Sequence, residues 1–304
     1  MLLFIEQLLN GLQLGVMLFL LSAGLTLVFG IMRVINLAHG SLYMVGAYIA
    51  ATAFQYTGSF LLALMAALPV AAVVGMIVEM VVLRRLYERD HLDQVLATFG
   101  LILFFNELTR IIWGRQPLFM DVPKWLSSTV EIIPGAPYPS YRLAIILVGM
   151  LVAVFLYLLL TRTRLGMQIR AGASNREMVA ALGVNINLLN TLVFGLGALL
   201  AGLAGAMAGP ILAVESGMGE SILILTFVVI VIGGIGSIRG ALIGALLVGL
   251  VETLGGYLLP ELLRLFLPPA MADGAGASLA SMAVYILMAA VLIWRPRGLF
   301  PAHG

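Results

Sequence analysis

The sequence predicts an all-α integral membrane protein, a polytopic helical bundle of about nine transmembrane segments, with eight to ten as the range. Of its 304 residues, 62% are hydrophobic and only 10% are charged, whereas roughly a quarter of the residues in a soluble domain are charged. Apolar runs of about 20 residues, the length that crosses a bilayer, recur from one end of the chain to the other. No polar block between them is long enough for a soluble domain, so we expect residues 1–304 to form a single transmembrane domain.

The predicted spans are the windows in which apolar residues predominate. The second window contains polar residues and the seventh is short, so either could be a broken or re-entrant helix. The nine windows are Leu8–Gly30, Ile35–Tyr56, Phe60–Leu83, Val95–Trp113, Leu143–Leu160, Leu188–Ile211, Ser221–Gly234, Ala241–Leu259 and Leu279–Trp294.

Three stretches between these windows are rich in residues that break helices. Gly114–Tyr141 and Pro260–Ser278 contain many Pro, Gly and Ser residues, which favours loops or short surface helices. Gly233–Gly244 predicts a tight turn between the seventh and eighth spans, with Arg239 anchoring it at the inner face.

The arginines predict the orientation of the chain in the membrane. Placing the loop Arg84–Gln94 inside puts eleven arginines inside, against only four basic residues outside. We therefore expect the amino terminus outside and the carboxy terminus inside. The other inside arginines are Arg33, those within Arg162–Arg176, Arg239, Arg295 and Arg297, and the outside residues are Arg115, Lys124, Arg142 and Arg264.

Several classes of function are excluded by missing motifs. The chain has no cysteine, and its three histidines, His39, His91 and His303, are far apart in the sequence, so a metal site is not expected. No G-x-x-x-x-G-K-[ST], G-x-S-x-G or H-E-x-x-H pattern occurs. The sequence therefore does not indicate an enzyme, and it contains no recognisable ATP-binding loop of its own.

The loop over residues 161–188 contains a predicted helix. Ser174 and Glu177 have the spacing of a capping box, and Gly183 is placed to end a helix of about two to three turns. Met178, Ala181 and Leu182 would form one small apolar face on it. Such a face either packs back on the membrane domain or docks to a soluble subunit, and we favour docking.

Polar residues within the predicted spans are costly to bury in lipid and usually face the bundle interior. Glu107 and Arg110 are three residues apart and are expected to pair on one helix face. Asn36 and His39, also three apart, would point the same way in a helix and either line a polar path or make a buried structural contact. Glu79, Asn106 and Glu252 are further residues of this kind, and of these Glu79 and Glu252 remain unexplained.

Three blocks of the sequence resemble one family along nearly the whole chain. They are "AGLTLVFGIMRVINLAHGSLYMVGAYIA", "RAGASNREMVAALGVNIN" and "GGIGSIRGALIGALLVG". In order and spacing they resemble the permease subunits of branched-chain amino acid ABC importers, the LivH type. The resemblance implies the ABC importer permease fold and the transport of branched-chain or other apolar amino acids across a bacterial inner membrane, with a periplasmic amino terminus and a cytoplasmic carboxy terminus.

The resemblance also implies partners and site residues. The permease would pair with a second permease subunit, identical or related, together with two cytoplasmic ATPase subunits that bind ATP and Mg and a periplasmic substrate-binding protein. Asn36, His39 and Gly40 would form a polar break that shapes the translocation path. The coupling contact with the ATPase would be made by Ser174, Glu177, Met178, Ala180, Ala181, Leu182 and Gly183. The family's E-A-A-x-x-x-G signature is altered here, because Met178 and Val179 intervene between Glu177 and the alanines.

Alternatives remain open at this point. The same type of importer could carry urea or short amides, or a sulfur-containing or aromatic amino acid, because no residue in the sequence distinguishes between these substrates. From another class, a stand-alone secondary carrier or channel would need a proton or sodium site among Glu79, Glu107 and Glu252.

Overall fold

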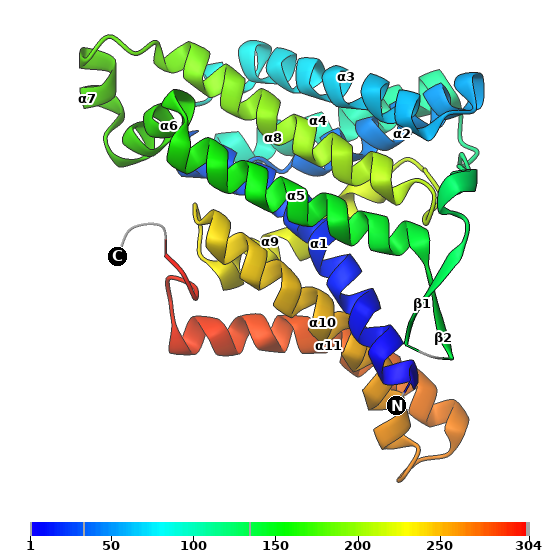
Figure 1. The fold of residues 1–304 in the computed structure, drawn as a ribbon. Helices are drawn as coiled ribbons and strands as arrows, with labels where there is room; N and C mark the ends of the chain where they lie inside the picture. Colours follow the sequence, from blue (N-terminus) through cyan, green and yellow to red (C-terminus); the bar gives the residue numbers. More distant parts are fainter. Residues whose placement is uncertain (1, 33, 134, 302–304) are drawn as a thin grey trace. The chain divides into compact units, whose positions relative to one another are not determined.

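A computed structural model describes residues 2–32, 34–133 and 135–301. Arg33 and His303, which entered the predictions above, lie outside the described residues. The described chain is helical apart from one β-hairpin and short connections (Figure 1). Its elements are α1 (Leu2–Met32), α2 (His39–Thr57), α3 (Phe60–Val81), α4 (His91–Trp113), β1 (Thr129–Ile133), β2 (Ala136–Pro139), α5 (Ser140–Arg162), α6 (Arg164–Ser174), α7 (Arg176–Ala181), α8 (Ile186–Ala208), α9 (Met218–Gly233), α10 (Ile238–Leu263) and α11 (Pro269–Trp294), with single 3-10 turns at Leu83–Arg85 and Lys124–Leu126.

The predicted all-α membrane architecture is confirmed. Each of the nine predicted windows falls on a helix, and seven helices of the described residues are long and apolar enough to span a membrane. The two exceptions are the windows that the sequence marks as unusual: α2 carries polar residues, and α9 has only 16 residues. The seven helices are α1, α3, α4, α5, α8, α10 and α11.

Polar side chains at several loop ends explain where the helices start. Ser59 caps α3, Asn185 caps α8 and Ser237 caps α10, each by accepting a hydrogen bond from the backbone N–H three residues further on. Such a cap satisfies one of the N–H groups that a helix start leaves without a partner. The helix boundaries therefore follow from short-range chemistry, while the apolar content decides which helices span the membrane.

The described residues belong to two compact units, each assembled from separate parts of the chain. Of the described residues, the first unit contains 2–19, 124–133, 135–150 and 225–301, and the second contains 20–32, 34–123 and 151–224. Neither unit is a domain that begins and ends once in the sequence. The single-domain organisation over residues 1–304 stays a prediction.

In the second unit, α2, α3 and α8 pack against one another. Gly46 of α2 faces Gly202 of α8 so closely that a Cβ at Gly46 would overlap the Gly202 backbone. Small residues let helix backbones approach in this way, which is the usual basis of helix packing in membranes. At this contact α2 and α8 meet through their backbones, whereas large buried side chains such as Tyr43, Tyr48 and Phe194 fill other parts of the core.

In the first unit, α10 and α11 pack side by side (Figure 1). The predicted tight turn is confirmed, because α9 ends at Gly233 and α10 begins at Ile238, with Gly234 and Gly236 at positive φ. The N–H of Phe300 donates to the carbonyl of Gly233 over 2.9 Å, which ties the end of the described chain to α9.

Two of the predicted loops differ from expectation. The stretch Gly114–Tyr141 contains the antiparallel β1–β2 hairpin, and most of Pro260–Ser278 is helical because α10 extends to Leu263 and α11 begins at Pro269. Pro269 occupies the first position of a helix, where no backbone N–H is needed. Gly276 lies directly against Pro260, so this glycine serves helix packing, whereas Gly274 faces open space.

Candidate functional site

The predicted polar break lies between α1 and α2. Helix α1 ends at Met32, residues Val34–Ala38 are not helical, and α2 begins at His39. The Asn36 Oδ1 atom accepts a hydrogen bond from the N–H of Ala38 over 3.1 Å, which turns the chain just before the helix starts. The expectation that Asn36 and His39 share one helix face is therefore wrong, because Asn36 lies outside the helix and bonds to the backbone.

His39 is fully buried at the start of α2. Its Nε2 atom donates to the carbonyl oxygen of Leu21 on α1 over 3.2 Å. Gly24 makes room for the ring, since a Cβ there would lie 3.0 Å from this nitrogen. Within the described chain, the Nδ1 atom of His39 and the Nδ2 atom of Asn36 have no hydrogen-bond partner. Buried polar atoms of this kind cost roughly 1–3 kcal/mol each. Such atoms are not confined to the break, because Thr26, Gln94 and Asn190 contain them too.

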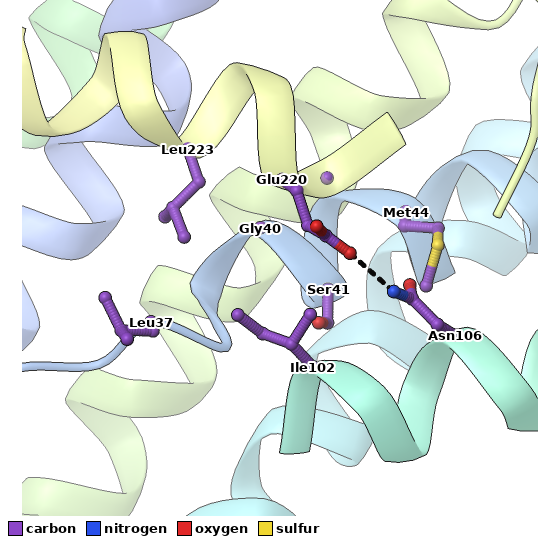
Figure 2. A pocket seen from close by; sticks show the side chains of 9 residues that line it. Leu37, Gly40, Ser41, Met44, Ile102, Asn106, Glu220 and Leu223 are labelled. Carbon is purple, nitrogen blue, oxygen red and sulfur yellow. Dashed lines mark hydrogen bonds between the residues drawn. The ribbon is translucent and has the colours of Figure 1, made fainter. Parts of the chain in front are cut away.

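Next to this break lies a narrow crevice, which in this conformation is too small to hold a molecule (Figure 2). Gly40 is the only one of the predicted pathway residues that lines it, and the backbone of Gly40 touches that of Gly219 on α9. Three elements of the second unit contribute the lining: the start of α2, the middle of α4 and the start of α9. The lining residues are Leu37, Gly40, Ser41, Met44, Ile102, Asn106, Gly219, Glu220 and Leu223.

One end of the crevice is polar. The Asn106 Nδ2 atom donates to Glu220 Oε1 over 2.6 Å, as Figure 2 shows. One turn along α4, Arg110 pairs with Glu107 over 2.6 Å, which confirms the predicted pair, and its Nε donates to Ser216 over 3.1 Å. Glu220 and Ser216 were missed because they lie at or before the edge of the seventh predicted window and more than 100 residues from their partners.

The crevice therefore offers two kinds of surface. Its walls include the aliphatic side chains of Leu37, Ile102 and Leu223 and the thioether of Met44. Its polar end consists of the Glu220 carboxylate and the Asn106 amide, whereas Arg110 lies outside the lining and pairs with Glu107. The lining thus combines apolar walls with one acidic, hydrogen-bonded end.

The loop over residues 161–188 folds into two short helices, α6 and α7. The predicted capping box is wrong by one residue: Ser174 ends α6, and Asn175 caps α7 by accepting from the N–H of Met178 over 3.0 Å. Asn is as good a cap as Ser and lies one position nearer to the helix. Helix α7 has six residues, which is shorter than the predicted two to three turns.

Gly183 ends α7 as predicted, with a positive φ of 87°. The N–H of Gly183 donates to the carbonyl of Ala180, and the N–H of Val184 donates to the carbonyl of Val179. This pair of hydrogen bonds is the Schellman arrangement that terminates many helices, and the left-handed residue in it is usually glycine.

The side chains of α7 divide between an anchor and an outward face. Val179 is 6% exposed, whereas Met178 is 61% exposed and Leu182 is 78% exposed. The helix therefore packs on its own chain through Val179, which the sequence did not single out, and not through the predicted face. The other predicted coupling residues are also exposed: Ser174, Glu177, Ala180, Ala181 and Gly183.

Glu79, which the sequence left unexplained, lies at the centre of a hydrogen-bonded cluster on the side of α3 that faces α8. Its carboxylate accepts from Arg84 over 2.9 Å, from the Tyr87 hydroxyl over 2.6 Å and from the Thr191 hydroxyl over 2.7 Å. We call these four residues the Glu79 cluster. The charge is thus paired inside the second unit, while Glu252 lies half-buried on α10 of the first unit.

A multi-pass bundle with a break between two helices and a lined crevice beside it is typical of membrane transport proteins. Residues 7–293 match the family of permease components of branched-chain amino acid transport systems, and the chain belongs to this family.

Relatives with assigned names support this placement. The branched-chain amino acid permease BraD of Pseudomonas aeruginosa is 30% identical, and the alignment covers 97% of this chain and 95% of BraD. LivH of Salmonella typhimurium is 30% identical over 85% of this chain and 88% of LivH. The ribose import permease RbsC of Escherichia coli is 27% identical over 82% of this chain and 77% of RbsC. No solved structure matches the chain.

Proposed function

We propose that this chain is the transmembrane permease subunit of an ATP-driven importer that moves branched-chain amino acids across a bacterial inner membrane. The observation that carries the proposal is the family match over residues 7–293. Relatives named for branched-chain amino acids align with up to 97% of this chain, whereas the ribose permease aligns with 82% at lower identity. A sugar is therefore the less well supported substrate.

The crevice supports an amino acid as substrate. Once the crevice opens during transport, its aliphatic walls suit a branched side chain, and Glu220 suits the ammonium group of an amino acid. Urea has neither an apolar side chain nor a charge, so it would leave most of this lining unused. Asn36 and His39 shape the break that brings Gly40 to the crevice, and affinity for the free amino acid resides in a binding protein.

The expected partners are the other subunits of such an importer, each of which has a separate function. ATP and Mg bind to two cytoplasmic ATPase subunits, a second permease completes the path, and a periplasmic protein delivers the substrate. Helix α7 is the contact with the ATPase, because Met178 and Leu182 expose apolar surface that water disfavours and that a protein cleft would cover. The arginines of residues 162–176 favour a cytoplasmic position for this loop, and therefore a periplasmic amino terminus.

A stand-alone secondary carrier is less well supported. It would need a titratable or sodium-binding carboxylate among Glu79, Glu107 and Glu252. Glu79 is paired with Arg84 and Glu107 is paired with Arg110, so two of the three candidates already have a cationic partner.

Uptake by the complete importer tests the proposal. The chain, expressed with its second permease, ATPase and binding-protein subunits, is reconstituted in lipid vesicles and supplied with labelled leucine, ribose or urea. We expect leucine uptake only with ATP, with little uptake of ribose or urea. Leucine uptake by the isolated chain under an ion gradient, or ATP-driven uptake of urea in place of leucine, would contradict the proposal.

A further inference from the structure

The Glu79 cluster connects three parts of the second unit. Glu79 belongs to α3, Arg84 and Tyr87 belong to the connection between α3 and α4, and Thr191 belongs to the first turns of α8. Glu79 is 0% exposed, and each of its two carboxylate oxygens accepts two hydrogen bonds. The cluster therefore holds these three segments at a fixed separation.

Stability alone is a poor explanation for such a cluster. Removing the Glu79 carboxylate from water costs several kcal/mol, and the Arg84 side chain, which is 34% exposed, offsets only part of that cost. Well-packed apolar residues often serve a protein core as well or better. A hydrogen-bonded pair with a buried carboxylate does differ from an apolar contact in one respect: its bonds are directional, so a change of register breaks them. A network of this kind suits an element that must occupy defined positions.

The cluster also reaches α7. Arg176, the first residue of α7, places its guanidinium 5.2 Å from the centre of the Tyr87 ring, within the range of a cation–π interaction. Burial and the neighbouring Glu79 carboxylate raise the pKa of Tyr87, so its hydroxyl remains protonated and donates to Glu79. Tyr87 thus contacts α7 with its ring face and Glu79 with its hydroxyl.

From the cluster, close backbone packing leads to the crevice. Glu79 and Thr191 lie on α3 and α8, and both helices pack against α2, which carries Gly40, Ser41 and Met44 of the lining. Because α2 and α8 touch through Gly46 and Gly202 with no side chain between them, a shift of α8 has to be followed by α2.

We infer that the Glu79 cluster, together with Arg176, transmits displacements of α7 to α3 and α8 and thereby links the ATPase contact to the substrate crevice. Arg176, Tyr87 and Glu79 are positioning residues in this process. The inference rests on the proposed function, since it takes α7 as the site where the ATPase acts. The inference adds a side-chain connection between α7 and the membrane-spanning helices, in addition to the backbone that joins α7 to α8.

Conservative variants of the complete importer test this route. Tyr87→Phe removes the hydroxyl bond to Glu79 and keeps the ring beneath Arg176, while Arg176→Gln removes the cation and keeps most of the side-chain length. Arg164→Gln, at an exposed arginine that starts α6, is the matched control. The readouts are ATPase capture, ATP hydrolysis, leucine taken up per ATP hydrolysed and the thermal midpoint of the purified complex.

We expect Tyr87→Phe and Arg176→Gln to keep ATPase capture and hydrolysis but to lower leucine uptake per ATP about fivefold or more, the lower end of common coupling strengths. Arg164→Gln should leave this ratio unchanged. An unchanged ratio in both test variants would overturn the inference. So would a parallel fall of uptake, hydrolysis and thermal midpoint, which indicates a structural role only. Failure of the unmodified chain to capture an ATPase would instead contradict the proposed function.

Discussion

The break between α1 and α2 and the loop that carries α7 use the same local chemistry in opposite surroundings. In both, an asparagine accepts a hydrogen bond from the backbone just ahead of it: Asn36 from Ala38, and Asn175 from Met178. At the break, polar atoms of Asn36 and His39 are buried without partners in the described chain. At α7, the apolar side chains of Met178 and Leu182 are exposed.

The side chains of the two regions differ from their surroundings in opposite ways. A polar group in an apolar interior and an apolar group at an exposed surface each carry a free-energy cost until something else satisfies them. Local hydrogen bonds therefore set the backbone shape of both segments, while long-range packing decides which of their side chains are buried and which are exposed. We propose that the translocation path supplies partners for the buried polar atoms of the break. We propose likewise that an ATPase covers the exposed apolar side chains of α7.

The largest effect is expected at Gly40. A Cβ at this position would overlap the backbone carbonyl of Gly219, so Gly40→Ala forces α2 and α9 apart. We expect Gly40→Ala to lower the thermal midpoint strongly and to abolish uptake.

Gly100→Ala on α4 is the matched control, because a Cβ there meets open space. Its effect should be neutral or slightly stabilising, since Ala is about 1 kcal/mol better than Gly inside a helix. Equal thermal midpoints for the two variants would show that the contact between Gly40 and Gly219 is not close enough to matter.

A smaller, more selective effect is expected at His39. His39→Leu removes one buried polar atom without a partner and one hydrogen bond to Leu21, so stability should change little. If the break shapes the path, leucine uptake should fall about fivefold, which corresponds to about 1 kcal/mol of activation free energy.

The matched control for this prediction is His91→Leu. His91 is also the first residue of a helix, α4, but it is exposed. Unchanged uptake in His39→Leu, or an equal loss of uptake in both variants, would show that the break does not contribute to the translocation path.

Features that depend on neighbours in sequence were predictable. The apolar windows identified the helices because membrane insertion depends on local composition, and the pair of Glu107 and Arg110 was predictable because the two residues are one helical turn apart. Gly183 could be recognised as the end of α7 because a left-handed residue at a helix end is usually glycine.

Features that depend on distant partners were not predictable. Thr191 lies 112 residues from Glu79, and Glu220 lies 114 residues from Asn106, so no spacing rule joins them. The burial of Val179 and the exposure of Met178 are set by what packs beside α7 in three dimensions. The same holds for the crevice, which three separated elements assemble.

The central claim is that α7 is the contact with an ATPase, and capture of the ATPase subunits expressed with this chain tests it most directly. The purified chain is compared with Met178→Asp/Leu182→Asp and with Met167→Asp, a control at an exposed methionine of α6. We predict that the unmodified chain and the control retain the ATPase and that the double variant loses it, with equal thermal midpoints for all three. Equal capture by the double variant, or no capture by the folded unmodified chain, would contradict the account.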